Sequence, residues 1–157
     1  MEEYENNPKW RMNPKKVLVL IAAALLVGYL LCAFAPGYVL FKTVGSDTVE
    51  ALGYVNLIDL FARTDKLASV LIPFVIYWVL ALGSLYFLAR SFLDVPFVGD
   101  KEDKHFVFGF VVFVLAHATN AVTLFVQQSI AMMAPAAALT AFGLIALVVH
   151  FRVLSDV

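Results

Sequence analysis

Four long apolar stretches, separated by shorter polar segments, dominate the pattern of this chain. They cover roughly residues 17–41, 67–92, 106–126 and 132–151. Each comes close to or exceeds the ~20 residues that a helix needs to cross a bilayer core about 30 Å thick. None contains Asp, Glu, Lys or Arg before its last few positions. The pattern therefore predicts an all-α, polytopic membrane protein in which four transmembrane helices form a bundle.

The segment between the first two stretches has a pattern of its own. Within residues 42–66, apolar side chains recur every three positions, at Val49, Leu52, Val55, Ile58 and Phe61. This spacing is close to that of an amphipathic helix. We therefore expect a short amphipathic helix in the first outer loop, lying on the membrane face or folded back as a lid over the bundle.

Composition strengthens the membrane interpretation. Of the 157 residues, 62% are hydrophobic and 15% are charged, against about 45–50% and about 25% in a typical soluble domain. Lipid must cover this excess, so we expect one membrane domain over residues 1–157, with residues 1–16 as a polar tail. A signal peptide is an alternative for the first stretch, because Lys15 and Lys16 precede it and Ala33-Phe34-Ala35 looks like a cleavage site. Since Pro36 follows that site, we expect an uncleaved first span.

The basic residues predict an orientation. If both termini are cytoplasmic, eight of the eleven Lys and Arg lie inside and three lie outside. The positive-inside rule favours that arrangement. We expect a multi-pass protein of the plasma membrane, in a layout common in the bacterial inner membrane. The formal net charge of −1 gives no case for nucleic acid as a partner.

Small residues mark two of the spans. Ala24, Gly28 and Cys32 follow each other at four-residue steps in the first span. The fourth span contains Ala134, Ala137, Ala138, Ala141, Gly143 and Ala146. Because small residues allow helices to approach closely in lipid, they are favoured at helix contacts. We expect these faces to pack inside the bundle, with contacts between protein chains as the alternative.

The third span contains the one polar pattern of interest. Four polar side chains lie on a single arc of the expected helix: His117, Asn120, Thr123 and Gln127. Unsatisfied polar groups are costly in lipid, so this stripe must face other helices or water. One interpretation is a polar pathway that runs outward from mid-bilayer. The other is that these side chains hydrogen-bond to neighbouring helices and hold the bundle together.

No motif in the chain identifies a family, a catalytic residue, a metal site or a cofactor. One cysteine cannot form a redox pair, and the span interiors contain no Asp for an aspartyl protease. Haem needs two axial histidines at similar depth on different helices. His105 and His117 share one helix, and His150 is nearest in depth to His105, about 6 Å out of register. We expect no cofactor and no enzymatic activity.

Three functions remain open at this point. The leading one is a non-catalytic accessory or structural subunit that acts through helix–helix contacts, in a homo-oligomer or with a larger membrane protein partner in the lipid bilayer. The alternative is a minimal carrier or pore for a small solute, which uses the polar stripe in an oligomer. A membrane-bound enzyme or haem protein is the third.

Overall fold

Four helices make up most of the computed structural model, which describes residues 14–32, 36, 38–44, 48–56, 58–59, 62, 67–94, 104–126 and 129–154. Their bounds are α1 Pro14–Cys32, α3 Leu67–Asp94, α4 Lys104–Val126 and α5 Ile130–Val149, and a π-helical turn η1 at His150–Leu154 extends α5. Each helix is long and apolar enough to span a membrane. The prediction of a four-helix membrane bundle is confirmed.

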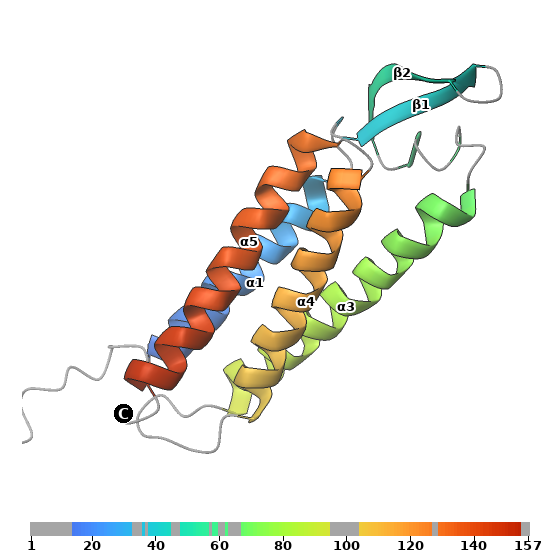
Figure 1. Ribbon diagram of the computed structural model, residues 1–157. Coiled ribbons are helices and arrows are strands. Elements are labelled where there is room, and N and C mark those ends of the chain that lie inside the picture. Colours follow the sequence, from blue (N-terminus) through green and yellow to red (C-terminus); the bar gives the residue numbers. More distant parts are fainter. Residues whose placement is uncertain are drawn as a thin grey trace, which may run out of the picture.

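The helices lie side by side and run alternately up and down (Figure 1). α4 packs along α3 and α5, and α1 packs against α3 and α5 from the other side. We call the end at which α1 begins and η1 finishes the termini end. The opposite end, beyond which two strands lie, is the hairpin end (Figure 1). Every helix therefore runs the length of the bundle and contributes side chains at both ends.

The first span is shorter than the sequence predicted. The apolar stretch continues to residue 41, but α1 ends at Cys32 and Tyr38 already belongs to strand β1. Pro36, at a bend between them, lacks the N–H that a helix would need at that position. The apolar residues after it pair with a second strand, so the apolar stretch contains two different elements. The other three spans agree with their predicted ranges to within two or three residues, η1 included.

Over residues 48–55 the expected amphipathic helix in the first outer loop is wrong, because these residues form a strand. Strand β1 (Tyr38–Val44) pairs antiparallel with β2 (Thr48–Val55), and only positions 58, 59 and 62 in this segment are described as helical. Four of the residues in these two strands are Val and two, Thr43 and Thr48, are Thr. This β-branched composition favours strands. A bulge occurs between Leu40 and Phe41, and Gly53 beside it has a φ of 128°, which suits glycine. Backbone pairing thus overrides the three-residue period.

The core lies along α4. Its fully buried phenylalanines at positions 106, 110 and 113 pack ring to ring, with centroids 4.7 Å and 6.0 Å apart in order. Two glycines allow neighbouring helices to come close to α4. A Cβ at Gly109 would lie 3.2 Å from the backbone N of Leu88 in α3, and a Cβ at Gly143 would lie 2.8 Å from the Phe113 ring. Close packing of this kind is what holds helices together in lipid.

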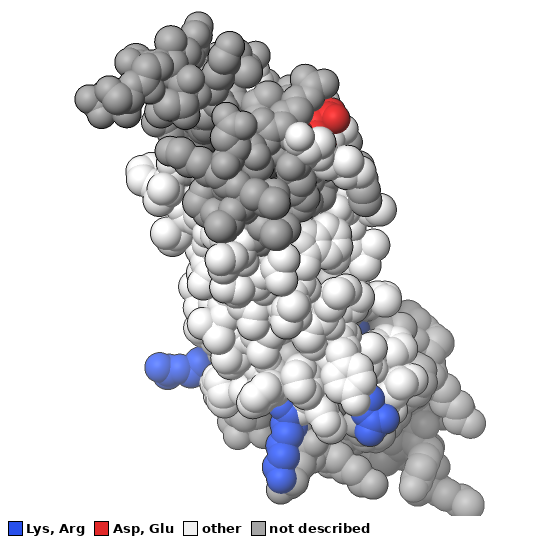
Figure 2. Space-filling model, turned by 90° about the vertical axis from the view of Figure 1, so that its right-hand side faces the viewer, with Lys and Arg blue, Asp and Glu red and all other residues white. Residues whose placement is uncertain are grey.

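Charge is confined to the two ends of the described surface. The Lys and Arg residues of the helices all belong to turns at the termini end: Lys15, Lys16, Arg90, Lys104 and Arg152. Lys42 belongs to β1. Asp59 lies at the hairpin end, and a broad uncharged band separates it from the basic side chains on the face shown in Figure 2. Large apolar side chains are exposed along this band. In water such a surface would drive aggregation, so lipid is its natural solvent.

Candidate functional site

The polar stripe of the third span divides in the structure. His117 and Asn120 lie on the inner face of α4 and are 0% and 2% exposed. Thr123 is half-buried, and its hydroxyl donates to the carbonyl of Thr119 in its own helix at 3.0 Å. Gln127 lies outside the described residues. The structure therefore brings two of the four predicted residues into the core, and beyond them toward the hairpin end it buries Leu124.

His117 bonds through both ring nitrogens. Its Nδ1 is 2.8 Å from the carbonyl oxygen of Phe113, one turn earlier in α4. A carbonyl only accepts, so Nδ1 carries the proton and donates. Nε2 is 3.4 Å from the Tyr77 hydroxyl of α3, and in the neutral ring it accepts from that O–H. The imidazole is thereby fixed in one tautomer and one orientation.

Asn120 begins a second chain of hydrogen bonds. Its Nδ2 donates to the Tyr29 hydroxyl of α1 at 2.8 Å, across two helices. That hydroxyl in turn donates to the carbonyl of Met132 at the start of α5 at 3.1 Å. The Asn120 amide nitrogen and the Tyr29 hydroxyl thus each have a protein partner, as the low dielectric of a membrane interior demands. The chain ties α1, α4 and α5 together at one level of the bundle.

Three rings close the cluster. The centroids of Tyr29, Tyr77 and His117 lie 5.7–5.9 Å from one another, and every pair is edge-to-face. Such ring pairs add about 0.5–1.5 kcal/mol each beyond the area they bury. We call Tyr29, Tyr77, His117 and Asn120 the polar node. It connects all four helices, because Met132 supplies the contact from α5.

The sequence pattern did not indicate two members of the polar node. Tyr29 and Tyr77 lie in otherwise apolar stretches, and nothing in their spacing marks them as partners of the third span. Their chemistry could have indicated them, because a tyrosine hydroxyl within a span needs a hydrogen-bond partner. Away from the span ends, the imidazole and the carboxamide both belong to the third span, as His117 and Asn120, so they were the strongest candidate partners for such a hydroxyl.

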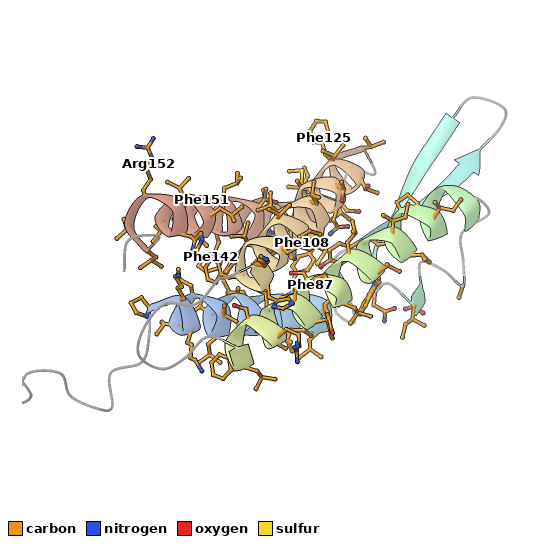
Figure 3. The ribbon with its side chains drawn as sticks, turned by 90° about the horizontal axis from the view of Figure 1, so that it is seen from below. Phe87, Phe108, Phe125, Phe142, Phe151 and Arg152 are labelled. Atoms are coloured by element: carbon orange, nitrogen blue, oxygen red, sulfur yellow. The ribbon has the colours of Figure 1, made fainter. Side chains whose placement is uncertain are left out.

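The other two histidines pack as aromatic rings at the termini end. His105 stacks on Phe87, with centroids 6.2 Å apart and planes at 21°. His150 packs on Phe106 with centroids 4.8 Å apart. Figure 3 shows Phe87 and Phe108 between α3 and α4, well apart from η1. Among the described residues, no group of three or more His, Cys, Asp and Glu is placed to hold a metal ion.

The small-residue faces point away from the bundle, against the expectation of internal packing. Ala24, Gly28 and Cys32 of α1 are exposed. On α5 the exposed alanines are Ala134, Ala137, Ala138 and Ala141. Of the small residues expected to pack, Gly143 and Ala146, nearer the termini end, are buried, and Ala136 is buried as well. The reason is that α1 buries larger side chains such as Leu26 and Tyr29, which leaves its small residues on the opposite side.

The outer face of α5 changes character along its length. Near the hairpin end it exposes the four alanines at positions 134–141. Toward the termini end it exposes Leu144, Ile145 and Val148, each at least half exposed. The second half is what a lipid-facing helix normally presents. The first half resembles a helix–helix contact surface without a partner in this chain.

Comparison with models of known protein families, with curated proteins and with solved structures gave no match. The fold and the polar node therefore have to be interpreted from their own chemistry.

Proposed function

We propose that this integral membrane protein is a non-catalytic accessory or structural subunit, which acts through helix contacts with a second copy or with a larger membrane protein. The observation that carries the proposal is the exposed alanine face of α5, at positions 134, 137, 138 and 141. In lipid, small residues at a helix surface permit the close approach on which association depends. The exposed Ala24, Gly28 and Cys32 of α1 offer a second face of the same kind.

The polar node supports this proposal from the inside. Its hydrogen bonds connect α1, α3, α4 and α5 to one another. A subunit that presents a fixed surface to a partner needs helices that keep their register. Directional bonds between buried polar groups provide it, because a shift of one helix would leave a donor or acceptor unsatisfied.

The test is an assembly measurement on the full chain in vesicles and in native membranes solubilised with mild detergent. Ala138→Leu enlarges the proposed contact face but leaves it apolar. The matched control is Ala89→Leu, which enlarges an exposed alanine on α3. We expect wild type and Ala89→Leu to form a complex larger than one chain, and Ala138→Leu to lose it while keeping its helical circular dichroism. A wild-type chain that is monomeric in both settings contradicts the proposal, as does equal loss in both variants.

Location and orientation belong to the same proposal. We propose a bacterial inner membrane with both termini in the cytoplasm. With both termini inside, eight of the eleven Lys and Arg of the sequence are cytoplasmic, and Lys42, Arg63 and Lys66 are outside, which is the asymmetry that the positive-inside rule uses. A fluorescent protein fused after residue 157 should mature and fluoresce, whereas an alkaline phosphatase fusion at the same point should be inactive. The reverse pattern would invert the topology.

The second candidate is a minimal carrier or pore for a small solute. What favours it is that His117 and Asn120, two groups able to bind a solute, lie buried together in mid-bundle. His117→Phe retains an aromatic ring and removes both nitrogens. Solute uptake or conductance in proteoliposomes that this variant abolishes, without loss of folded protein, would favour the carrier over the subunit.

A further inference from the structure

A row of aromatic side chains crosses the face shared by α3 and α4 near the termini end. Tyr86 is 61% exposed and Phe108 is 58% exposed. Phe87 lies between them, with its ring centroid 5.4 Å from Tyr86 and 5.0 Å from Phe108. His105 stacks on the same Phe87 ring. The row is therefore a contact between helices and also part of the outer surface.

Two exposed cations lie one turn beyond this row. Arg90 follows Tyr86 by four residues in α3, and Lys104 precedes Phe108 by four residues in α4. Residues four apart lie on one face of a helix, about one turn or ~5.4 Å along it. Because α3 and α4 are antiparallel, both steps lead toward the termini end. Arg90 and Lys104 thus form a basic row directly beyond the aromatic row.

We propose that this surface binds the headgroup region of an acidic phospholipid. Tyr86 has an apolar ring with a polar edge, the kind of side chain that prefers the boundary between acyl chains and headgroups, and Phe87 and Phe108 add apolar surface beside it. Lys and Arg next to that boundary attract anionic lipids electrostatically. The aromatic row holds the glycerol and upper acyl region, and Arg90 and Lys104 contact the phosphate. A zwitterionic lipid fits the aromatic row equally well, but its own cation competes with the basic row.

Arg152 supplies a matched comparison. It is exposed at the same end, but it belongs to η1 and points away from the bundle, far from Phe87 and Phe108 (Figure 3). The sequence also contains Asp94, Asp100, Glu102 and Asp103 between the two cations of the proposed site. The overall charge of this end therefore does not by itself select an anionic lipid. A preference has to come from the placement of Arg90 and Lys104.

The experiment is native mass spectrometry of the full chain in detergent with an equimolar mixture of phosphatidylglycerol and phosphatidylcholine of identical acyl chains. We expect wild type to retain phosphatidylglycerol at least about 5-fold better, which corresponds to one effective cation. Arg90→Gln/Lys104→Gln should bind the two lipids equally. Arg152→Gln should keep the wild-type preference. Inorganic phosphate, compared with chloride at equal ionic strength, should not displace the bound lipid.

Each alternative outcome overturns the proposal. Equal retention of both lipids by wild type removes the acidic-lipid preference. If Arg152→Gln loses as much of the preference for phosphatidylglycerol as the double variant does, the positive charge of this end attracts the lipid diffusely and there is no defined site. Displacement by inorganic phosphate assigns the cations to a free anion. If the double variant fails to fold, a salt titration of wild type decides: the preference must fall as ionic strength rises, since exposed charges are screened.

Discussion

The two halves of the core around α4 are built on different principles. Toward the termini end, Phe106, Phe110 and Phe113 fill the interior with rings. Toward the hairpin end, His117 and Asn120 occupy equivalent inward positions and bind tyrosines of other helices. The boundary is sharp, since the Phe113 and His117 rings are only 4.4 Å apart.

The difference shows that, in lipid, one set of side chains fills the core and another set fixes the register of the helices. Phenylalanine rings stabilise by dispersion and by filling space, and they tolerate small rotations of a helix. Hydrogen bonds do not tolerate them, because buried groups left unpaired are costly. A bundle with the phenylalanine half alone would pack well, but it would have no fixed registration of α1 against α5. The polar node provides that at a single level.

The largest effect is expected from a cavity in the phenylalanine half. Phe110→Ala removes a fully buried ring that contacts Phe106 and Phe113. A Phe→Ala change in a core costs about 3–5 kcal/mol in water, and we expect the lower end here because lipid is as apolar as the core. Unfolding by sodium dodecyl sulfate in mixed micelles, followed by circular dichroism, measures it. A loss below 1 kcal/mol would mean that the rings do not dominate packing.

A smaller effect is expected where α5 crosses this half. In Gly143→Ala the new Cβ lies 2.7 Å from Val114 and 2.8 Å from the Phe113 ring, so either these side chains or α5 must shift. Overpacking of this kind costs about 1–3 kcal/mol. Gly83→Ala in α3 is the control, because a Cβ there meets nothing within 4 Å. The same unfolding assay should find Gly83→Ala at least as stable as wild type. Equal losses would indicate a propensity effect instead of a close contact.

The polar node should contribute less to the free energy of unfolding, but the effects of changing its members should be coupled. Tyr29→Phe removes the hydroxyl that accepts from Asn120 and donates to Met132, and Asn120→Leu removes the other partner. Hydrogen bonds between membrane helices average about 0.6 kcal/mol, with a maximum near 1.7. The double variant should lose less than the sum of the single losses. Strict additivity of the two losses would show that the two side chains act independently. The hairpin half of the core would then not be held together by a hydrogen-bonded network.

The bundle was predictable because lipid imposes a length on every apolar stretch. Three spans lie where the pattern placed them. The first is shorter than predicted, because one continuous apolar stretch supplies both a helix that ends at Cys32 and a strand that begins at Tyr38. The hairpin was missed for a related reason. The three-residue period in 49–61 fits a helix locally, whereas pairing with residues 38–44 is a contact between segments that no local period records.

The candidate site was predictable in part. Lipid offers polar groups in a span no hydrogen-bond partner, so these groups must face inward. The burial of His117 and Asn120 was therefore predictable. The identity of their partners does not follow from the sequence, because the rotation of each helix about its axis decides which tyrosine faces His117 and Asn120. The same rotation explains the alanines of α5. Met132, Ala136, Leu139, Gly143 and Ala146 form the packing face of α5, and the alanines at positions 134, 137, 138 and 141 lie outside it.

The smallest effect is expected at Thr123, and it separates a continuous polar stripe from a local node. Its hydroxyl bonds to the carbonyl of Thr119 in the same helix, which satisfies it without another span. Thr123→Val retains the shape and removes the hydroxyl, so we expect a change within about 0.5 kcal/mol in the unfolding assay. A loss as large as that of Asn120→Leu would extend the hydrogen-bonded network one turn toward the hairpin end. The polar half of the core would then be a stripe that reaches the surface, as a solute pathway requires.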